Sequence, residues 1–309
     1  MNQRQTALAY LLLSPFLITF AIFLLIPVVY SLWLSFHSVS IYSDLFNVFG
    51  DLRFVGFRNY SDLLEDNHFL FSMLLTMVYA AITIPGTILF SLCLALLLNN
   101  SLPGKSLFRS AFFLPNILDM LVVGFVWQLI YSPKFGFLTV LLEKFLHIHT
   151  FHDSGFLANP YTALPAIALA MILKGAGFGM ILFLASLNNI PKDLFEAASI
   201  DGANRLEIFL NVTLPQLIPT ILFLIVTGIM AALNGFTEIY AMSSGGPQFV
   251  GNRIFGGETL GATRIAGYYL WQVFSEGRYG YAAAMSYMML LFALFISYIN
   301  VKFLQPRMN

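Results

Sequence analysis

Six long apolar segments alternate with shorter polar ones along the chain. A helix needs about 20 mostly apolar residues to cross the hydrocarbon core of a bilayer. The first segment is much longer than the apolar region of a secretory signal peptide, so we expect it to be retained as a helix. The pattern therefore predicts an all-α integral membrane protein with six transmembrane helices, at Leu8–Leu34, Phe69–Leu98, Phe112–Ile130, Tyr161–Leu187, Leu217–Tyr240 and Ala282–Phe303.

The composition also indicates a membrane protein. Hydrophobic residues make up 59% of the 309 residues and charged residues only 10%, whereas soluble domains have about 25% charged residues. Because the formal net charge is zero, no overall positive field attracts nucleic acid, and we expect no nucleic-acid partner. The single cysteine, Cys93, lies in an apolar run, which excludes an intrachain disulfide and predicts a buried thiol.

The lysines and arginines between the apolar segments predict the orientation in the membrane. If the N-terminus is cytoplasmic, seven basic residues fall on each side, but those on the inner side lie in shorter segments. Positive charge in short loops determines orientation, so we expect both termini in the cytoplasm. The polar segment at 190–219, between the fourth and fifth apolar runs, then also faces the cytoplasm.

This polar segment has helix-forming sequence on both sides of a glycine. Pro191 suits a first helical turn, and Asp193 and Glu196 favour the positive N-terminal end of a helix. Gly202 predicts a flexible joint or a helix stop. Pro215 lacks a backbone N–H and predicts the end of a second short helix. The segment is therefore expected to form two short helices joined at a glycine.

The order and spacing of residues in this segment resemble a known motif. It is similar to the EAA motif in the permease subunits of bacterial ABC importers, and its form is most like the carbohydrate branch, to which the maltose system belongs. In that family the segment docks as a coupling helix on the ATPase subunit, so the resemblance implies the same role here. Val212 stands where isoleucine is usual. The residues that carry the match, and that the resemblance assigns to ATPase coupling, are Glu196, Ala197, Ala198, Asp201, Gly202, Ala203, Phe209, Leu214 and Pro215.

Short motifs elsewhere in the chain are similar to the same family, in the same order. The resemblance implies residues 1–68 as the N-terminal tail, first helix and external loop, and residues 69–306 as a five-helix core of the ABC transmembrane type-1 permease fold. The segment from Gln248 to Ala266 is longer than the family pattern. The motifs are Phe54-Val55-Gly56-Phe57 with Asn59-Tyr60, Arg109 with Leu114-Pro115, Gly245-Gly246-Pro247, and Gly280-Tyr281-Ala282 with Ala284.

The resemblance implies a non-catalytic subunit of a complex in the bacterial cytoplasmic (inner) membrane. The implied partners are a second homologous permease subunit, two ATPase subunits and an extracytoplasmic solute-binding protein, and the solute is a sugar or a related small molecule. No cofactor is expected in this chain, because the partner ATPase uses ATP and Mg²⁺. The stretch Leu102–Ser106 does not complete a phosphate-binding loop, since Asn99 occupies the position of its first glycine.

Other functions remain open at this point. An ion-coupled secondary transporter would act without an ATPase, but such proteins commonly show an internal repeat, and no clear repeat is present. An ABC importer for glycerol-3-phosphate is a further alternative. The side chains of His147, His149, His152 and Asp153 are of types that suit zinc. A polar outer loop is the favoured interpretation, and we predict no metal site.

Three ionisable residues fall inside the predicted membrane segments. Such groups are costly in lipid and usually face a partner or a wet cavity. We consider Lys174, Asp119 and Glu238 candidates for the solute pathway, and a purely structural pairing of Lys174 with Asp119 is the alternative. Beside Lys174, Gly175 and Gly179 have the spacing that allows close helix packing. Local unwinding of the helix towards solute is the other interpretation of these glycines.

Overall fold

The computed structural model describes residues 3–40, 42–43, 52–100, 103–147, 151, 153–250 and 257–304. In this part the chain is mainly helical, with two short antiparallel hairpins, β1 (His37–Ser38) with β2 (Arg53–Phe54) and β3 (Gln248–Phe249) with β4 (Leu260–Gly261). The chain divides into two compact units. Unit 1 contains Met1–Asp66 and Leu270–Leu290, and unit 2 contains Asn67–Tyr269 and Leu291–Asn309.

Unit 1 begins with a long apolar helix. It consists of α1 (Gln3–Phe20), the π-helical turn η1 (Ala21–Leu25) and α2 (Ile26–Ser35), and it is followed by α3 (Arg58–Glu65). The Asn59 amide donates hydrogen bonds to the carbonyls of Ser35 (2.8 Å) and His37 (3.1 Å). The Tyr60 hydroxyl lies 2.7 Å from the Ser35 hydroxyl. The motif around these two residues therefore joins the outgoing chain to the end of the first apolar helix.

The last helix begins against the same region of unit 1. It is α14 (Tyr279–Leu304), which follows α13 (Ala266–Ser275). A Cβ atom at Gly280 would collide with the His37 carbonyl, and the Tyr281 hydroxyl donates to Asp66 Oδ2 at 2.7 Å. Further along α14, the Tyr287 hydroxyl donates to the Val28 carbonyl at 2.6 Å. Position 280 therefore requires glycine, because the backbone at His37 lies where the Cβ atom of any other residue would be.

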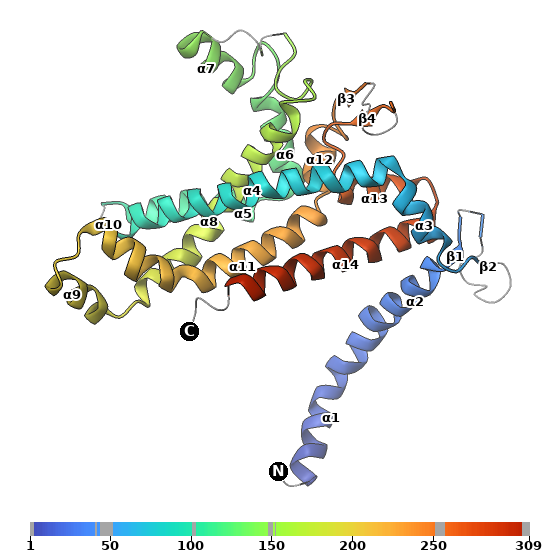
Figure 1. Cartoon of the computed structure of the whole chain (residues 1–309), viewed down its shortest axis with the longest axis horizontal. Coiled ribbons are helices and arrows are strands. Elements are labelled where there is room, and N and C mark those ends of the chain that lie inside the picture. Colours follow the sequence, from blue (N-terminus) through green and yellow to red (C-terminus); the bar gives the residue numbers. More distant parts are fainter. Residues whose placement is uncertain are drawn as a thin grey trace. The chain divides into compact units, whose positions relative to one another are not determined.

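Unit 2 holds the remaining helices. The pair α4 and α8 forms its most extensive helix contact among the described elements, and α11 packs against both (Figure 1). A short polar section at one end joins α8 to α11. The helices are α4 (Asn67–Asn99), α5 (Lys105–Ile117), α6 (Met120–Ile130), α7 (Phe137–Leu146), α8 (Ala163–Asn188), α9 (Lys192–Ile200), α10 (Arg205–Ile208), the π turn η2 (Phe209–Thr213), α11 (Leu214–Leu233) and α12 (Thr237–Met242).

Within the described residues, five helices are long and apolar enough to cross a membrane, and a broken pair makes up to six. The third predicted segment, Phe112–Ile130, is not one straight helix. It divides into α5 and α6, which meet at 103°. The break lies at Leu118 and Asp119, where the backbone is extended and the Asp119 side chain accepts the N–H of Leu121 (2.8 Å). An aspartate at this position caps a new helix rather than continuing the old one.

The fifth predicted segment, Leu217–Tyr240, also ends earlier than expected. The helix stops at Leu233, and Glu238 lies on the separate helix α12. A Cβ atom at Gly235, in the turn between the two helices, would lie 2.7 Å from Glu238 Oε1. The turn therefore needs glycine, and it brings the carboxylate back towards the end of α11.

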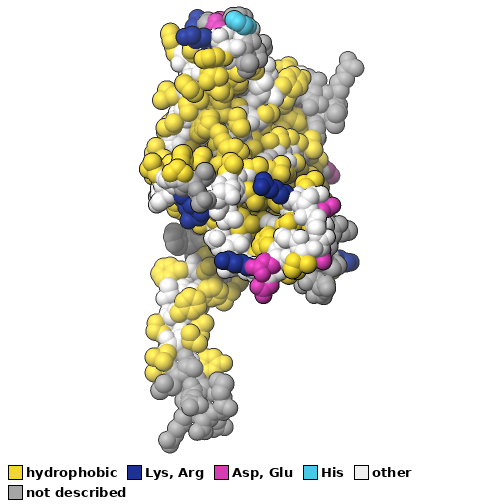
Figure 2. Space-filling model, turned by 90° about the vertical axis from the view of Figure 1, so that its left-hand side faces the viewer, with side chains coloured by type: hydrophobic (Ala, Val, Ile, Leu, Met, Phe, Trp, Pro, Cys, Tyr) yellow, Lys and Arg dark blue, Asp and Glu magenta, His cyan; other side chains and the backbone are white. Residues whose placement is uncertain are grey.

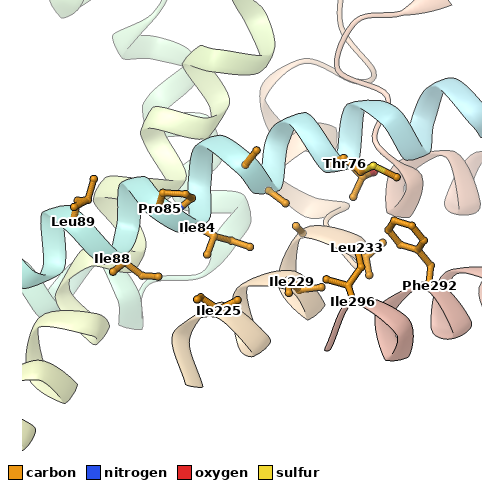
Figure 3. A pocket seen from close by; sticks show the side chains of 14 residues that line it. Thr76, Ile84, Pro85, Ile88, Leu89, Ile225, Ile229, Leu233, Phe292 and Ile296 are labelled. Atoms are coloured by element: carbon orange, nitrogen blue, oxygen red, sulfur yellow. The ribbon is translucent and has the colours of Figure 1, made fainter. Parts of the chain in front are cut away.

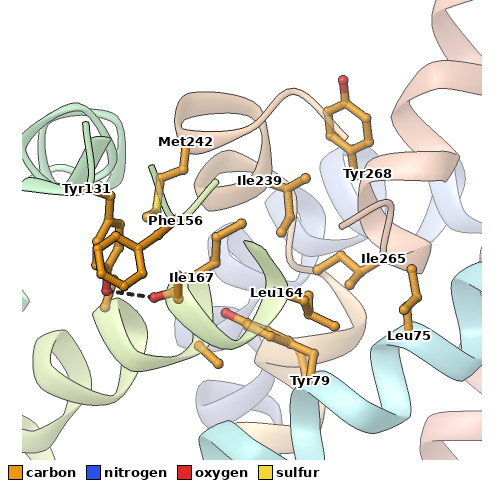
Figure 4. Close-up of a cluster of buried hydrophobic side chains, with 14 of the residues drawn as sticks. Leu75, Tyr79, Tyr131, Phe156, Leu164, Ile167, Ile239, Met242, Ile265 and Tyr268 are labelled. Carbon is orange, nitrogen blue, oxygen red and sulfur yellow. Dashed lines mark hydrogen bonds between the residues drawn. The ribbon is translucent and has the colours of Figure 1, made fainter. Parts of the chain in front are cut away.

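Among the described residues, two apolar clusters lie in the interior of unit 2. The first gathers side chains of α4, α8, α12 and α13 around Tyr131, whose hydroxyl donates to the Ala166 carbonyl at 2.8 Å (Figure 4). Burial raises the pKa of Tyr131, so its phenol stays protonated and keeps this bond. The second cluster joins α4, α8 and α11 around Met180, Phe183 and Leu217. In lipid such packing is stabilised by van der Waals contact and interhelical hydrogen bonds.

The cysteine prediction was wrong. Cys93 is exposed on α4 and is a free thiol. In a membrane helix an apolar sequence does not distinguish a side chain that faces the protein from one that faces lipid, because both surroundings are apolar.

Candidate functional site

The polar section between α8 and α11, which we call the coupling segment, spans residues 190–219. Its first helix, α9, ends at Ile200, and Gly202 then adopts a positive φ of 80°. The N–H groups of Asp201 and Ala203 donate to the carbonyls of Ala197 and Ala198, both at 3.0 Å. No atom lies within 4 Å of where a Cβ of Gly202 would stand. Glycine is therefore favoured at this helix stop because of the positive φ, and not because a side chain would lack room.

The second helix of the coupling segment has a complete cap. The Asn204 side chain accepts the N–H groups of Leu206 and Glu207, both at 3.0 Å. In return the Glu207 carboxylate accepts the N–H of Asn204 at 2.7 Å. This reciprocal arrangement satisfies donors that the first turn of a helix otherwise leaves free.

Pro215 does not end this second helix, contrary to the sequence prediction. The helix runs without interruption from Arg205 to Leu233, 29 residues, through the π turn η2. In that turn the N–H of Leu214 donates to the carbonyl of Phe209, five residues back. A wider turn gives room for a proline, whose ring would clash with the carbonyl four residues earlier in an α-helix. The coupling segment is thus directly continuous with the fifth span.

Two phenylalanines fix the coupling segment to the span helices. Phe195 and Phe209 are partly buried and pack against the second apolar cluster. The surfaces of Glu196, Ala197 and Asp201 are exposed, and Figure 1 places α9 at one end of unit 2. Of the predicted coupling residues, Phe209 is therefore packed against the span helices. Glu196, Ala197 and Asp201 are accessible to a partner.

A cavity of about 330 Å³ lies between the membrane helices of unit 2. Both Lys174 and Glu238 line it, whereas Asp119, the third predicted residue, does not. Its other polar side chains come from α4, α5 and α11, and they are Tyr79, Thr83, Thr87, Asn116 and Thr227.

Glu238 is the most buried of the predicted ionisable residues. Its side chain is 7% exposed, and the Tyr79 hydroxyl donates to Oε1 at 3.4 Å. Lys174 interacts electrostatically with both Glu238 and Asp119, yet among the described residues neither carboxylate comes within 4.0 Å of its ammonium. A direct Lys174–Asp119 pair is therefore absent in this part of the structure. A basic and an acidic side chain instead line the same small cavity without a direct ion pair.

Tyr79, Thr83 and Thr87 were not identified from the sequence. They follow one another at intervals of four residues on α4, so they share one face of that helix. A polar stripe with this spacing inside an apolar segment is the signal that would have found them. The Thr83 hydroxyl also donates to the Tyr79 carbonyl within the helix, at 2.8 Å.

The glycines beside Lys174 serve close packing. Helix α8 is continuous from Ala163 to Asn188, so local unwinding is not observed. A Cβ atom at Gly179 would collide with the Ser91 hydroxyl of α4, and the same hydroxyl donates to the Ala176 carbonyl at 3.0 Å. These residues let α4 and α8 approach closely beside the cavity.

A second cavity of about 530 Å³ lies between α4, α11 and α14 (Figure 3). Its lining is apolar except for Thr76. The Thr76 hydroxyl already donates to the Ser72 carbonyl (2.7 Å) and accepts the Ala266 N–H (2.8 Å). No free polar group is therefore available there for a hydroxylated solute, although this cavity is the larger one.

Two of the four residues of the zinc alternative, His149 and His152, lie outside the described part of the chain. Among the residues that the structure does describe, no group of three or more potential metal ligands comes together.

The helical spans, the polar segment joined to one of them and the cavity between the helices are typical of a multi-pass membrane transport protein. Residues 67–309 match the family model described as "Binding-protein-dependent transport system inner membrane component". The chain belongs to this family and is a permease subunit of an ABC importer in the inner membrane. The predicted fold class and importer assignment are thereby confirmed.

Several relatives are similar over nearly their whole length. The trehalose/maltose transport system permease protein MalF of Thermococcus litoralis is 30% identical over 298 residues, 96% of this chain and 93% of the relative. The arabinooligosaccharides transport system permease protein AraP of Bacillus subtilis is 30% identical and covers 96% and 88%. The sn-glycerol-3-phosphate transport system permease protein UgpA of Yersinia pestis is 30% identical and covers 98% and 95%.

A solved structure has the same fold. It is a chain of a bacterial alginate ABC transporter in complex with an alginate pentasaccharide-bound periplasmic protein. The TM-score is 0.78 at 22% sequence identity, with 99% of this chain and 96% of that chain covered. At this identity the likeness concerns the fold alone.

Proposed function

We propose that this permease carries a neutral sugar or related polyol through the 330 Å³ cavity. Hydroxyl, amide, ammonium and carboxylate groups converge there from α4, α5, α8, α11 and α12. Hydroxyl groups of a sugar both donate and accept hydrogen bonds, and this mixture of donors and acceptors matches them. The names of the trehalose/maltose and arabinooligosaccharide relatives support the same solute class.

Glycerol-3-phosphate is the second candidate, because a relative is named for its transport. Among the described residues, Lys174 is the only lysine or arginine that lines the cavity, and Glu238 lines the same space. A carboxylate close to the cation repels a phosphate. The balance of one positive and one negative group therefore favours a neutral solute.

The chain acts without catalysing a reaction itself. In the proposed complex it pairs with a second homologous permease, two ATPase subunits bind ATP and Mg²⁺, and an extracytoplasmic binding protein delivers the solute. Both termini and the coupling segment face the cytoplasm. The ATPase subunits contact the exposed side of α9, where Glu196 and Asp201 lie.

The route from the ATPase to the solute is short in this arrangement. The second helix of the coupling segment continues from Arg205 through η2 into α11 without a break, and α11 contributes Thr227 and Gly228 to the cavity wall. A continuous hydrogen-bonded helix moves as one body more readily than a helix interrupted by a loop. Helix α9 contacts η2, so its displacement by the ATPase would be passed to this continuous helix and through it to the cavity.

The proposal is tested by purifying the tagged chain from its native membrane in mild detergent and identifying the proteins that accompany it. ATPase activity is then measured with binding protein loaded with a neutral sugar or with glycerol-3-phosphate. We expect an ATPase, a second permease and stimulation by the sugar-loaded protein. Stimulation only by glycerol-3-phosphate would reverse the solute assignment. A chain that purifies alone and transports in liposomes without ATP would overturn the proposed complex.

A further inference from the structure

Helix α7 exposes apolar side chains although it lies outside the membrane spans. The exposed fractions of Phe137, Val140 and Phe145 are 68%, 43% and 74%, and Phe135, just before the helix, is 90% exposed. Leu138 and Leu142 of α7 pack against the first apolar cluster. Apolar side chains therefore surround much of this short helix, and among the described residues only part of that surface is covered in unit 2.

The outward direction of these side chains is fixed by the turn that precedes α7. The Thr139 hydroxyl is buried and donates to the Ser132 carbonyl at 3.0 Å. A Cβ atom at Gly136 would collide with the Ser132 carbonyl and would lie 2.6 Å from the Ile130 carbonyl. Tyr131 anchors the start of the turn through its bond to the Ala166 carbonyl. The turn is therefore closely packed, and the exposed face of α7 is built into the fold.

The exposed face of α7 follows a membrane helix along the chain. Six residues separate Ile130, the end of α6, from Phe137, the start of α7, a distance of at most about 25 Å even when fully extended. The exposed apolar residues of α6 lie on one side of that helix, and they are Leu121, Val122, Phe125, Val126 and Leu129. Exposed apolar side chains thus occur both on α6 and on the helix that follows it along the chain.

Charged groups accompany this apolar surface. Lys134 and Lys144 are both exposed, one before α7 and one in its last turn. In Figure 2 hydrophobic side chains extend to the upper end of the face, where basic, acidic and histidine side chains gather; Figure 1 shows α7 at this end of unit 2. Aromatic and aliphatic side chains flanked by lysines are typical of helices that lie in the interface of a bilayer.

We propose that α7 is an interfacial membrane anchor. Its phenylalanines enter the boundary between lipid headgroups and acyl chains, and Lys134 and Lys144 contact lipid phosphates. A bilayer covers such a face permanently, whereas a binding protein that leaves in each transport cycle would return the face to water. Exposing apolar surface costs about 25 cal/mol per Å², which favours the permanent partner.

The test uses the full-length chain, with the subunits that copurify with it, in lipid nanodiscs. Cys93 is first replaced by serine, and a bimane fluorophore is attached to Phe137→Cys or Phe145→Cys. Two controls bracket the result. Leu129→Cys on α6 serves as the site in contact with lipid, and Asp62→Cys on α3, where the native side chain is 54% exposed, serves as the site in contact with water.

We expect nitroxide-labelled lipid to quench the probes at 137 and 145 about as strongly as the probe at 129. Aqueous iodide should quench them far less than it quenches the probe at 62. Because both native side chains point outwards, these substitutions leave the packed face of α7 intact. Iodide quenching equal to that at 62, with no effect of labelled lipid, would overturn the proposal. Quenching by iodide that disappears only when the binding protein is added would also overturn it and would identify α7 as a protein-docking surface.

Discussion

At the scale of single residues, the cavity combines groups that a membrane rarely contains. A buried carboxylate at Glu238 receives a hydrogen bond from Tyr79, and a lysine lines the same 330 Å³. A charged group is retained in a membrane when it is paired or when it faces a wet cavity. Since no direct ion pair forms at Lys174 among the described residues, the cavity is the better account of this lysine.

Replacing Lys174 with methionine is expected to reduce uptake while the complex still assembles. A hydrogen bond to a charged group is worth about 1.5–3 kcal/mol, which corresponds to roughly a 10- to 150-fold loss of uptake. The measurement is transport of labelled sugar in proteoliposomes, together with size-exclusion chromatography of the complex. Lys105→Met is the control, because Lys105 is only partly buried and lies outside the cavity. Loss of assembly in Lys174→Met alone would indicate a structural role instead.

Gly175 and Gly179, beside this lysine, are expected to differ in how well they tolerate replacement by alanine. A Cβ atom at Gly179 meets the Ser91 hydroxyl and lies 2.8 Å from Ser91 Cβ, whereas at Gly175 the nearest atom, Thr87 Cγ2, lies 3.4 Å away. Overpacking of this kind costs about 1–3 kcal/mol. Gly179→Ala should therefore lower the thermal unfolding temperature in detergent, and Gly175→Ala should have a much smaller effect. Equal effects of the two substitutions would contradict the close contact at Gly179.

At the scale of helices, the coupling segment is more closely joined to the membrane than its sequence suggests. Pro215 reads as a helix stop, but η2 accommodates it and the helix continues to Leu233. Local sequence rules weigh only the lost N–H bond and the ring clash. The packing of Phe209 against the second apolar cluster and the burial of Thr213 supply contacts that those rules do not include.

Reversing the charge at Glu196 is expected to uncouple transport from ATP hydrolysis. Glu196 is exposed on α9, so Glu196→Lys should leave the membrane fold intact. At an interface, an unfavourable charge pair costs several kcal/mol, and uptake should fall by about tenfold or more. The measurements are ATPase activity and uptake in proteoliposomes. Glu276→Lys, directly after α13, makes the same charge change at an exposed position and should have little effect on uptake or ATPase activity. If Glu196→Lys left both activities unchanged, α9 would not take part in coupling.

At the scale of the whole molecule, the proposed orientation depends on a modest difference in charge density. Seven lysines and arginines fall on each predicted side, and only the shorter inner segments favour a cytoplasmic N-terminus. A tag placed after Asn309 should be accessible to a membrane-impermeant reagent in inverted vesicles and protected in intact cells. The opposite pattern would place the coupling segment outside the cytoplasm and would contradict the proposed docking of the ATPase.

Much of the fold and part of the candidate site followed from sequence alone. The length of the apolar runs predicted membrane helices, because only a helix of about 20 residues satisfies its backbone across lipid. The spacing around Glu196 and Gly202 identified the family, which the match over residues 67–309 confirms. The break at Gly202 is local as well, since it depends on the backbone conformation of one residue.

Contacts between distant segments were decided only by the tertiary structure. Tyr79 and Glu238 are 159 positions apart in sequence, yet they share a hydrogen bond. The 103° bend between α5 and α6 and the exposure of Cys93 likewise depend on how whole helices pack. The physical reason is that local sequence determines whether a helix forms and where its ends are favoured, whereas facing partners determine which side is covered and which polar groups meet. Because the lipid around a membrane helix is itself apolar, hydrophobicity does not show which face of the helix points into the protein. The residues that line the cavity could therefore be identified only from the packing of the helices.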